Sequence, residues 1–199
     1  MLKEIRPAIT FIVTLTLITG VAYPFAMTGI AGVIFPSQAA GSLVEQNGKV
    51  IGSSVMGQEF KTDKYFHSRP SATTAPDPKD PTKTVSAPYN AANTGGSNYG
   101  STSKALMDRV KADVEALKKE NPSTQVPIDL VTTSASGLDP DISPEAALFQ
   151  VPRVAKARNM PEDRVRQLVE QHTEGRVLGL LGEPHVNVLL LNLALDAAK

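Results

Sequence analysis

The longest run of apolar positions lies near the beginning of the sequence. After Lys3 and Arg6, residues 7–38 carry no charge. A helix needs about 20 apolar residues to cross the hydrocarbon core of a bilayer, and residues 8–27 supply them. The pattern therefore predicts one transmembrane helix, with residues 1–36 forming a short cytoplasmic N-terminus and the anchor.

Further details of this segment bear on its place in a membrane. Cationic residues precede the apolar run, so the positive-inside bias places the amino end in the cytoplasm and residues 37–199 outside. Pro24 removes one backbone hydrogen bond, which predicts a kink. Ala22 and Ala26, one turn apart, offer a small-residue strip to a neighbouring helix, although alanine suits a lipid-facing position equally well. A cleaved signal peptide ending at Ser37-Gln38-Ala39 is the alternative, but its apolar core would span only about 7–15 residues.

Shorter apolar runs follow the anchor. Two of them flank Asn47-Gly48 within residues 41–52, and this dipeptide is a strong signal for a β-hairpin. Residues 55–60 are predicted to continue the sheet, and residues 62–67 to form a helical turn. Residues 71–101 are rich in Ser, Thr, Pro, Gly and Asn, and their prolines predict a long loop without regular strand pairing, part of which could face a partner.

Helical periodicity is clearest in residues 104–120. The apolar positions that recur there at helical spacing are Leu106, Val110, Val114 and Leu117. Residues 126–132 are predicted to form a strand and residues 161–172 a further helix. Residues 186–195 are apolar almost throughout and predict a core element, but periodicity does not decide between strand and helix. The predicted fold class is α+β: one transmembrane helix followed by a small mixed extracytoplasmic domain.

The segment around Ser143 admits two interpretations. Asp139, Asp141 and Ser143 imitate the beginning of a calcium-binding loop, but Pro144 stands where that loop requires glycine. Serine followed by proline is more typical of a helix N-terminus, with serine as the N-cap and proline at the first helical position. A helix is therefore expected to begin here, and Pro152 is expected to break it early.

Composition excludes several classes of function. Twenty basic residues balance twenty acidic ones, so no net charge attracts nucleic acid. The absence of cysteine excludes disulfides, thiolate zinc sites and thiol nucleophiles. The three histidines, His67, His172 and His185, lie too far apart in sequence to form a helical pair of metal ligands. We expect no tightly bound cofactor or metal.

Motifs for ATP-driven catalysis are incomplete. A pump of the phosphorylated-aspartate class needs Asp-Lys-Thr-Gly-Thr, whereas Asp63-Lys64 is followed by Tyr65. Gly52 and Gly57 have the spacing of a phosphate-binding loop, but Gln and Glu follow where Lys and Ser or Thr are needed. No Gly-x-Ser-x-Gly nucleophile elbow is present. The chain is therefore not expected to be an enzyme by itself.

Several segments, taken in order, resemble the C-subunit family of the bacterial Kdp high-affinity potassium-transporting P-type ATPase. The segments are Gly41-Ser-Leu-Val, Val50-Ile-Gly-Ser-Ser, Gly57-Gln-Glu-Phe, Tyr65-Phe-His-Ser-Arg-Pro-Ser-Ala72, Gly95-Gly-Ser-Asn98, Val126-Pro-Ile-Asp-Leu-Val-Thr-Thr-Ser-Ala-Ser-Gly-Leu-Asp-Pro-Asp-Ile-Ser-Pro144, Gln150-Val-Pro-Arg-Val-Ala-Lys-Ala-Arg158, Val186-Asn-Val-Leu and Leu191-Asn-Leu-Ala-Leu195. Together they cover essentially the whole chain.

The resemblance implies a non-catalytic accessory subunit in the bacterial inner membrane. Its partners would be an ATP-hydrolysing subunit, a channel-like potassium-binding subunit and a small single-span subunit, and those partners would handle ATP and potassium. The family is described as supporting assembly and as a catalytic chaperone that raises the ATP affinity of the hydrolysing subunit. Because the predicted orientation places the large domain on the side opposite ATP, we expect that domain to brace or cover the potassium entrance without touching nucleotide.

The candidate residues for contact with a partner are Tyr65, His67, Arg69, Asp139 and Asp141. Local hydrogen bonding within loops would account for the arginine and the aspartates equally well. Two other functions remain as alternatives, a membrane-tethered extracytoplasmic enzyme and a secreted binding protein.

Overall fold

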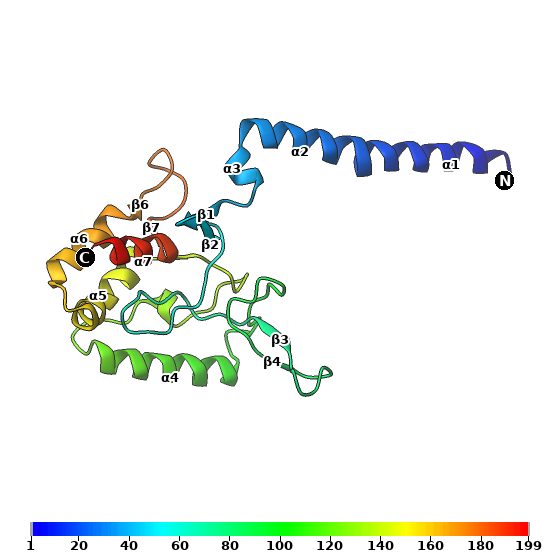
Figure 1. The fold of residues 1–199 in the computed structure, drawn as a ribbon. Coiled ribbons are helices and arrows are strands. Elements are labelled where there is room, and N and C mark those ends of the chain that lie inside the picture. The colour runs from blue at the N-terminus through cyan, green and yellow to red at the C-terminus, as the bar shows by residue number, and fades with distance from the viewer. Residues whose placement is uncertain (1, 199) are drawn as a thin grey trace. The chain divides into compact units, whose positions relative to one another are not determined.

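The structure is a computed structural model that describes residues 2–198. The chain divides into two compact units, Met1–Ser53 and Ser54–Lys199, and Figure 1 shows the order of elements within each. The first unit holds the apolar helix and a hairpin, and the second holds a small α+β domain.

The apolar segment is helical from end to end, but it is not a uniform α-helix. Helix α1 (Leu2–Leu17) passes into a π-helical turn, η1 (Ile18–Ala22), and then into α2 (Tyr23–Ile34). The backbone N–H of Tyr23 bonds to Ile18 O, five residues back. The π turn ends where Pro24, which has no N–H, enters the first turn of α2, so the hydrogen bond missing at the proline falls at a change of helix type.

This helix meets the length and composition needed to cross a bilayer over Lys3–Ile34, 32 residues, and it is longer than the run predicted from sequence. A short helix α3 (Pro36–Ala39) follows. Lys3–Ile34 is thus one candidate membrane span, which agrees with the predicted N-terminal helix.

The predicted hairpin is confirmed. Strands β1 (Leu43–Gln46) and β2 (Lys49–Ser53) pair antiparallel, with Gln46 opposite Lys49. The two turn residues, Asn47 and Gly48, have φ values of 54° and 74°, as a type I′ turn requires.

The core of the second unit lies among three helices and a small sheet. The helices are α5 (Pro144–Arg158), α6 (Glu162–Gln171) and α7 (Val188–Ala197). The sheet has the order β5-β7-β6 and is antiparallel throughout, with β5 (Asp141–Ile142), β6 (Thr173–Glu174) and β7 (His185–Asn187). Fully buried apolar residues from these elements surround Phe66, which comes from a distant loop.

Three predictions before residue 104 are wrong in whole or in part. Residues 55–60 form no strand of the sheet, and residues 62–67 contain only a turn, closed by Tyr65 N–H to Thr62 O at 3.1 Å. The loop 71–101 does contain a ladder, because β3 (Thr74–Pro76) pairs with β4 (Thr84–Ser86). Its prolines do not prevent this, since Pro76 stands at the end of β3.

Four later predictions meet different outcomes. Helix α4 (Lys104–Glu120) has the predicted bounds, whereas residues 126–132 hold a 3₁₀ turn, η2 (Ile128–Leu130), and not a strand. Ser143 is the N-cap of α5, since its Oγ accepts the Ala146 N–H at 3.0 Å. Pro152 does not break α5, because the helix buries residues on both sides of the proline and this packing outweighs the lost hydrogen bond.

The tail contains both structures that the sequence left open. Residues 185–187 form β7, and Asn187 then caps α7 by accepting Leu190 N–H at 3.2 Å. An apolar run with an Asn inside it can therefore be a strand followed at once by a helix, since the Asn side chain ends one element and begins the next.

Candidate functional site

Residues 63–67, called the strap, are held by side chains of α5 and α7. The Asn192 amide accepts a hydrogen bond from Phe66 N at 2.8 Å and donates one to Phe66 O at 3.0 Å. The Gln150 amide pairs with His67 in the same way, at 2.8 Å to N and 3.1 Å to O. Both amide residues are 2% exposed. Each therefore supplies the pairing that a neighbouring strand would otherwise supply.

Two arginines of α5 bind the rest of the strap backbone. Arg153 Nη1 donates to Asp63 O at 2.8 Å and to Tyr65 O at 3.0 Å. Arg158 Nε donates to Lys64 O at 2.6 Å, and its guanidinium lies 4.9 Å from the centroid of the Tyr65 ring. All five carbonyls of the strap thus accept hydrogen bonds from side chains, which fixes the path of the strap without a strand partner.

Carboxylates complete this arrangement at both ends. Glu120, the last residue of α4, accepts from Arg153 Nε at 2.8 Å. Asp196 accepts from Arg158 Nη2 at 2.7 Å and from Tyr65 Oη at 3.1 Å. Because charge-assisted hydrogen bonds to arginine are directional, the C-terminal end of α4 and the end of α7 are both tied to the strap.

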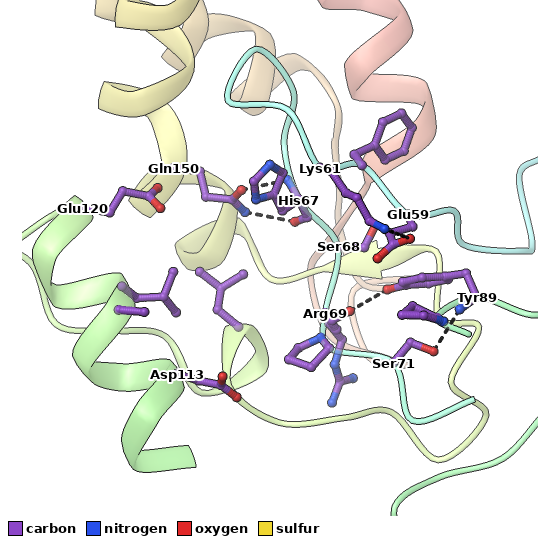
Figure 2. Close-up of a pocket in the computed structure, with 16 residues that line it drawn as sticks. Glu59, Lys61, His67, Ser68, Arg69, Ser71, Tyr89, Asp113, Glu120 and Gln150 are labelled. Atoms are coloured by element: carbon purple, nitrogen blue, oxygen red, sulfur yellow. Dashed lines mark hydrogen bonds and ion pairs between the residues drawn. The ribbon is translucent and has the colours of Figure 1, made fainter. Parts of the chain in front are cut away.

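A cleft of about 510 Å³ lies between α4 and the segment that leads away from the strap (Figure 2). Its polar lining residues are Glu59, Lys61, His67, Ser68, Arg69, Ser71, Tyr89, Asp113, Glu120 and Gln150. Several of them contact the protein itself: Lys61 pairs with Glu59 at 2.9 Å, and Tyr89 Oη donates to Arg69 O at 2.7 Å. The cleft is therefore lined by groups that already have partners.

Two titratable groups in the cleft are shifted by their surroundings. Burial lowers the pKa of His67 from 6.5, and the nearby Arg153 charge lowers it further. The His67 Nε2 lies 3.1 Å from Thr62 O, which suits the neutral ring with a proton on Nε2. Burial also raises the pKa of the Tyr89 hydroxyl to about 12. At neutral pH both side chains are uncharged.

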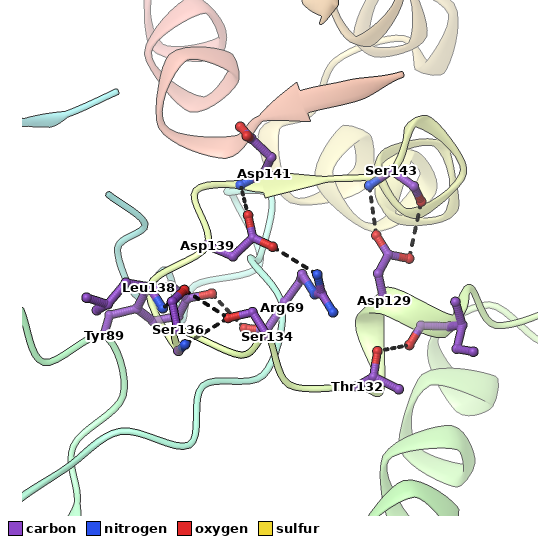
Figure 3. Close-up of polar contacts among 12 residues, drawn as sticks. Arg69, Tyr89, Asp129, Thr132, Ser134, Ser136, Leu138, Asp139, Asp141 and Ser143 are labelled. Carbon is purple, nitrogen blue, oxygen red and sulfur yellow. Dashed lines mark hydrogen bonds and ion pairs between the residues drawn. The ribbon is translucent and has the colours of Figure 1, made fainter. Parts of the chain in front are cut away.

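Beyond the cleft, Arg69 joins a second polar network (Figure 3). Arg69 Nη1 pairs with Asp139 Oδ2 at 2.8 Å, and Asp139 Oδ1 accepts from Asp141 N at 3.1 Å. Gly57 lies against the same turn: a Cβ there would come within 2.5 Å of Asp139 O. The close approach shows why this turn packs only against glycine.

Asp141 and Ser143 lie on the same stretch but have separate partners (Figure 3). Asn187 Nδ2 donates to Asp141 Oδ1 at 3.0 Å, and burial raises the pKa of the Asp141 carboxyl. Asp129 accepts from both Ser143 N at 2.7 Å and Ser143 Oγ at 3.2 Å. Asp129 thereby supports the N-cap of α5, so each of these carboxylates already binds loop backbone or a neighbouring side chain.

The five predicted contact residues fall into two groups. Tyr65 and His67 belong to the strap, while Arg69 and Asp139 form the ion pair and Asp141 follows it. Each of the five makes contacts within the chain. The hydrogen bonds within loops that the alternative interpretation expects are therefore present. The role of the five residues in partner contact stays a prediction.

Ala22 and Ala26 are both exposed within the helical unit, and their role in helix packing also stays a prediction. Among residues 2–198, no three His, Asp or Glu side chains gather as metal ligands would. The expectation that the chain holds no cofactor is likewise untested.

Sequence reasoning missed the residues that hold the strap. Gln150, Arg153 and Arg158 all lie in one segment of the family resemblance, and Asn192 lies in another. The available signal was a polar residue inside an apolar run: Asn192 sits within the buried face of α7. Buried amides need hydrogen-bond partners, so such a residue predicts a distant backbone segment, but not which one.

Comparison with known proteins covers nearly the whole chain. A family model described as KdpC, K+-transporting ATPase, c chain, matches residues 5–197. The chain is 75% identical over 198 residues to the potassium-transporting ATPase KdpC subunit of Bradyrhizobium diazoefficiens strain USDA 110, covering 100% of this chain and 98% of the relative. It is 73% identical to the subunit of that name in Rhodopseudomonas palustris strain BisB18, covering 100% of both, and 68% identical to the one in Methylobacterium nodulans, covering 98% of both. The chain therefore belongs to the KdpC family, the c chains of K+-transporting ATPases.

Proposed function

We propose that this chain is the non-catalytic accessory subunit of a potassium-transporting ATPase of the inner membrane. In this role the Lys3–Ile34 helix is its single span, the N-terminus is cytoplasmic, and the α+β unit stands in the periplasm. Its partners are the ATP-hydrolysing subunit, the potassium-binding subunit and a small single-span subunit. The family match over residues 5–197 supports the proposal.

One structural observation carries the non-catalytic part of the proposal. The polar side chains that surround the strap, Gln150, Arg153 and Asn192, bind its backbone atoms. These amide and guanidinium groups hold the backbone in place, and none of the three side chains is of a type that acts as a general acid or base near neutral pH. A rigidly held strap beside a cleft is what a subunit needs in order to present one fixed surface to a partner.

We propose further that the chain stabilises the assembled complex and raises the ATP affinity of the hydrolysing subunit by coupling, without touching ATP. With the α+β unit outside the cytoplasm, only the few residues before Pro7 and the span reach the side where ATP is bound. The effect would then be a shift between two states of the partner, both of which the accessory subunit contacts. We place its outer domain over the potassium entrance.

The test is to purify the complex in mild detergent with and without this chain. We expect the chain to copurify with a larger subunit that carries Asp-Lys-Thr-Gly-Thr, and its omission to raise the KM for ATP or to dissociate the complex. A photoreactive ATP analogue should label the larger subunit and leave this chain unlabelled. Isolation of the chain by itself from cells expressing all subunits would overturn the proposal, and labelling of this chain would overturn the coupling mechanism.

Orientation has its own test, because the chain contains no cysteine. A single cysteine at the exposed Ser101 should react with an impermeant maleimide added outside intact spheroplasts. The matched variant Lys3→Cys should react only after lysis. The reverse pattern would contradict the proposed orientation.

A further inference from the structure

An exposed apolar turn stands between β6 and β7. Residues 177–181, called the tip, read Val-Leu-Gly-Leu-Leu, and no charge interrupts them. Their large side chains are mostly exposed: Val177 65%, Leu178 88%, Leu180 79% and Leu181 64%. Exposed apolar residues scattered singly need no explanation, but four within five positions form a patch of the kind that marks an interaction site.

The tip is an ordered turn and not a slack loop. Val177 N donates to Leu181 O at 2.8 Å, and Leu181 N donates to Val177 O at 3.0 Å. Leu178 and Gly179 both have positive φ, 55° and 72°. A leucine in the left-handed region is strained, and its side chain, the most exposed of the four, gains no burial within the chain in return. Such strain at an exposed position points to a role in binding.

Charged residues stand at the base of the tip. Arg176 pairs with Glu183 at 2.6 Å and closes the turn, and Glu174 lies 3.8 Å from His185. Arg176 contributes one positive charge to the base, and Glu174 and Glu183 contribute two negative charges. An apolar end on a slightly acidic base suits an apolar pocket with a basic rim.

A bilayer suits the tip poorly. Segments that insert at a membrane interface carry Trp or Tyr and are rich in Lys or Arg. Residues 173–186 contain no aromatic residue and no lysine, and their one arginine is paired. The acidic base would also be repelled by anionic headgroups.

A second copy of the chain suits the tip poorly as well. A two-fold contact between tips would bring the same acidic residues, Glu174 and Glu183, from both copies together. Like charges brought together in this way oppose association. The binding partner that remains is another protein whose contact surface carries complementary charge.

We propose that residues 177–181 dock into an apolar, basic-rimmed pocket on another subunit of the potassium-transporting ATPase. This inference rests on the proposed function and deepens it, since it names the surface through which the accessory subunit grips its partner. Leu178 and Leu180 are the anchors, because they are the most exposed and flank the glycine of the turn. The Arg176–Glu183 pair holds the two arms of the turn together at its base.

The absence of cysteine allows a direct test in the intact complex. Leu178→Cys is compared with Ile128→Cys, a control position that is 76% exposed on η2. The rate of reaction with a water-soluble maleimide is measured for the whole complex in mild detergent, for the lone full-length chain in the same detergent, and for the lone chain in vesicles of neutral and anionic phospholipid. We expect assembly to slow labelling at position 178 by about tenfold or more relative to position 128.

Each result bears on the proposal. If the ratio of the labelling rates at positions 178 and 128 is unchanged in an intact, copurifying complex, the proposal that the tip docks into another subunit is overturned. The proposed function would still stand. Protection of position 178 in the lone chain in vesicles assigns the tip to lipid, and protection that grows with the concentration of the lone chain assigns it to a second copy. Either result overturns the docking to another subunit.

A second variant tests the contact without disturbing the turn. Leu178→Asn retains a residue that tolerates positive φ, so the turn should persist. We expect it to weaken retention of the chain in the complex by about tenfold, while Ile128→Asn has no such effect. Equal retention of both variants would contradict the role of Leu178 as an anchor.

Discussion

Helices α4 and α5 are similar in length, 17 and 15 residues, but differ in how much of their surface is buried. Helix α4 has regular apolar spacing, which allowed its bounds to be predicted from the sequence, yet none of its residues is buried. Helix α5 contains a proline, yet seven of its residues are buried. Figure 1 shows α4 running along the edge of the unit, while α5 lies among the other helices.

This difference shows that helix formation and burial are separate properties, although both are often predicted from the same hydrophobic pattern. Regular spacing shows that a helix will form and has an apolar face. Burial depends on what else packs on that face, and α5 is covered by α6, β7 and the strap. The energy that holds the unit together should therefore lie mainly in α5, and the part of α4 before its C-terminal tie to Arg153 should contribute little to folding.

The largest expected effect comes from truncating the core face of α5. Phe149 is 2% exposed, so Phe149→Ala should lower the free energy of unfolding by about 3–5 kcal/mol. The matched change on α4, Met107→Ala, removes a side chain that is 63% exposed and should cost less than about 0.5 kcal/mol. Urea unfolding of the full-length chain in detergent, followed by circular dichroism, measures both. Equal losses would break the comparison.

Hydrogen exchange should show the same contrast without mutation. Amides of α4 should exchange at least about a hundredfold faster than those in the middle of α5, because α4 can open locally while α5 opens only with the whole unit. Mass spectrometry of the native full-length chain resolves the two helices. Comparable protection in both would show that α4 is part of the cooperative core.

A third change separates polar from apolar contributions of α5. Gln150→Met keeps most of the side-chain volume but leaves the N–H and C=O of His67 without their amide partner. We expect a loss of about 1–3 kcal/mol. The control is Gln167→Met on the exposed face of α6, with an expected change below about 0.5 kcal/mol. A neutral result at position 150 would mean that water replaces the amide.

The smallest effect concerns His67, which lies between the two helices. Arg153 of α5 lowers the pKa of His67, and Glu120 of α4 raises it. Glu120→Gln should therefore lower the His67 pKa further, which NMR titration of the ring measures. An upward shift would contradict this assignment of charges.

The sign of the pH dependence follows from that lowered pKa. Because the folded state binds the proton less readily than the unfolded state, His67 contributes its stability fully above the unfolded pKa of about 6.5. That contribution declines as pH falls below 6.5 toward the folded pKa. The slope of stability against pH in this window should shrink in His67→Asn, and an unchanged slope would exclude His67 as its source.

Local signals in the sequence predicted the local structures correctly. Asn47-Gly48 fixed the hairpin turn, and Ser143 with Pro144 fixed the start of α5, because in each case the deciding contacts lie within a few residues. The failures involve contacts between distant segments. Residues 126–132 have strand composition, but no strand lies beside them, and Pro152 is tolerated because of packing that the sequence does not show.

The residues of the candidate site divide in the same way, into those that local sequence indicates and those that depend on contacts between distant segments. Tyr65 and His67 could be selected because they lie in a segment of the family resemblance. Two residues that anchor the strap, Gln150 to His67 and Asn192 to Phe66, pair across 83 and 126 residues of sequence, which a single sequence does not reveal. The tip was missed for a simpler reason: an apolar turn resembles a core segment until its exposure is known.

The π turn at Ile18–Ala22 changes the phase of the N-terminal apolar helix. One additional residue in a helical turn rotates everything after it by about 100° about the axis. A stripe that runs from Ala22, at the end of the π turn, to Ala26 in α2 is therefore not the continuation of any stripe obtained by counting through α1 in steps of 3.6 residues. A substitution scan along this helix should show its sensitive positions jumping by one place near residue 20, and deleting a single residue there would bring the two halves back into one register.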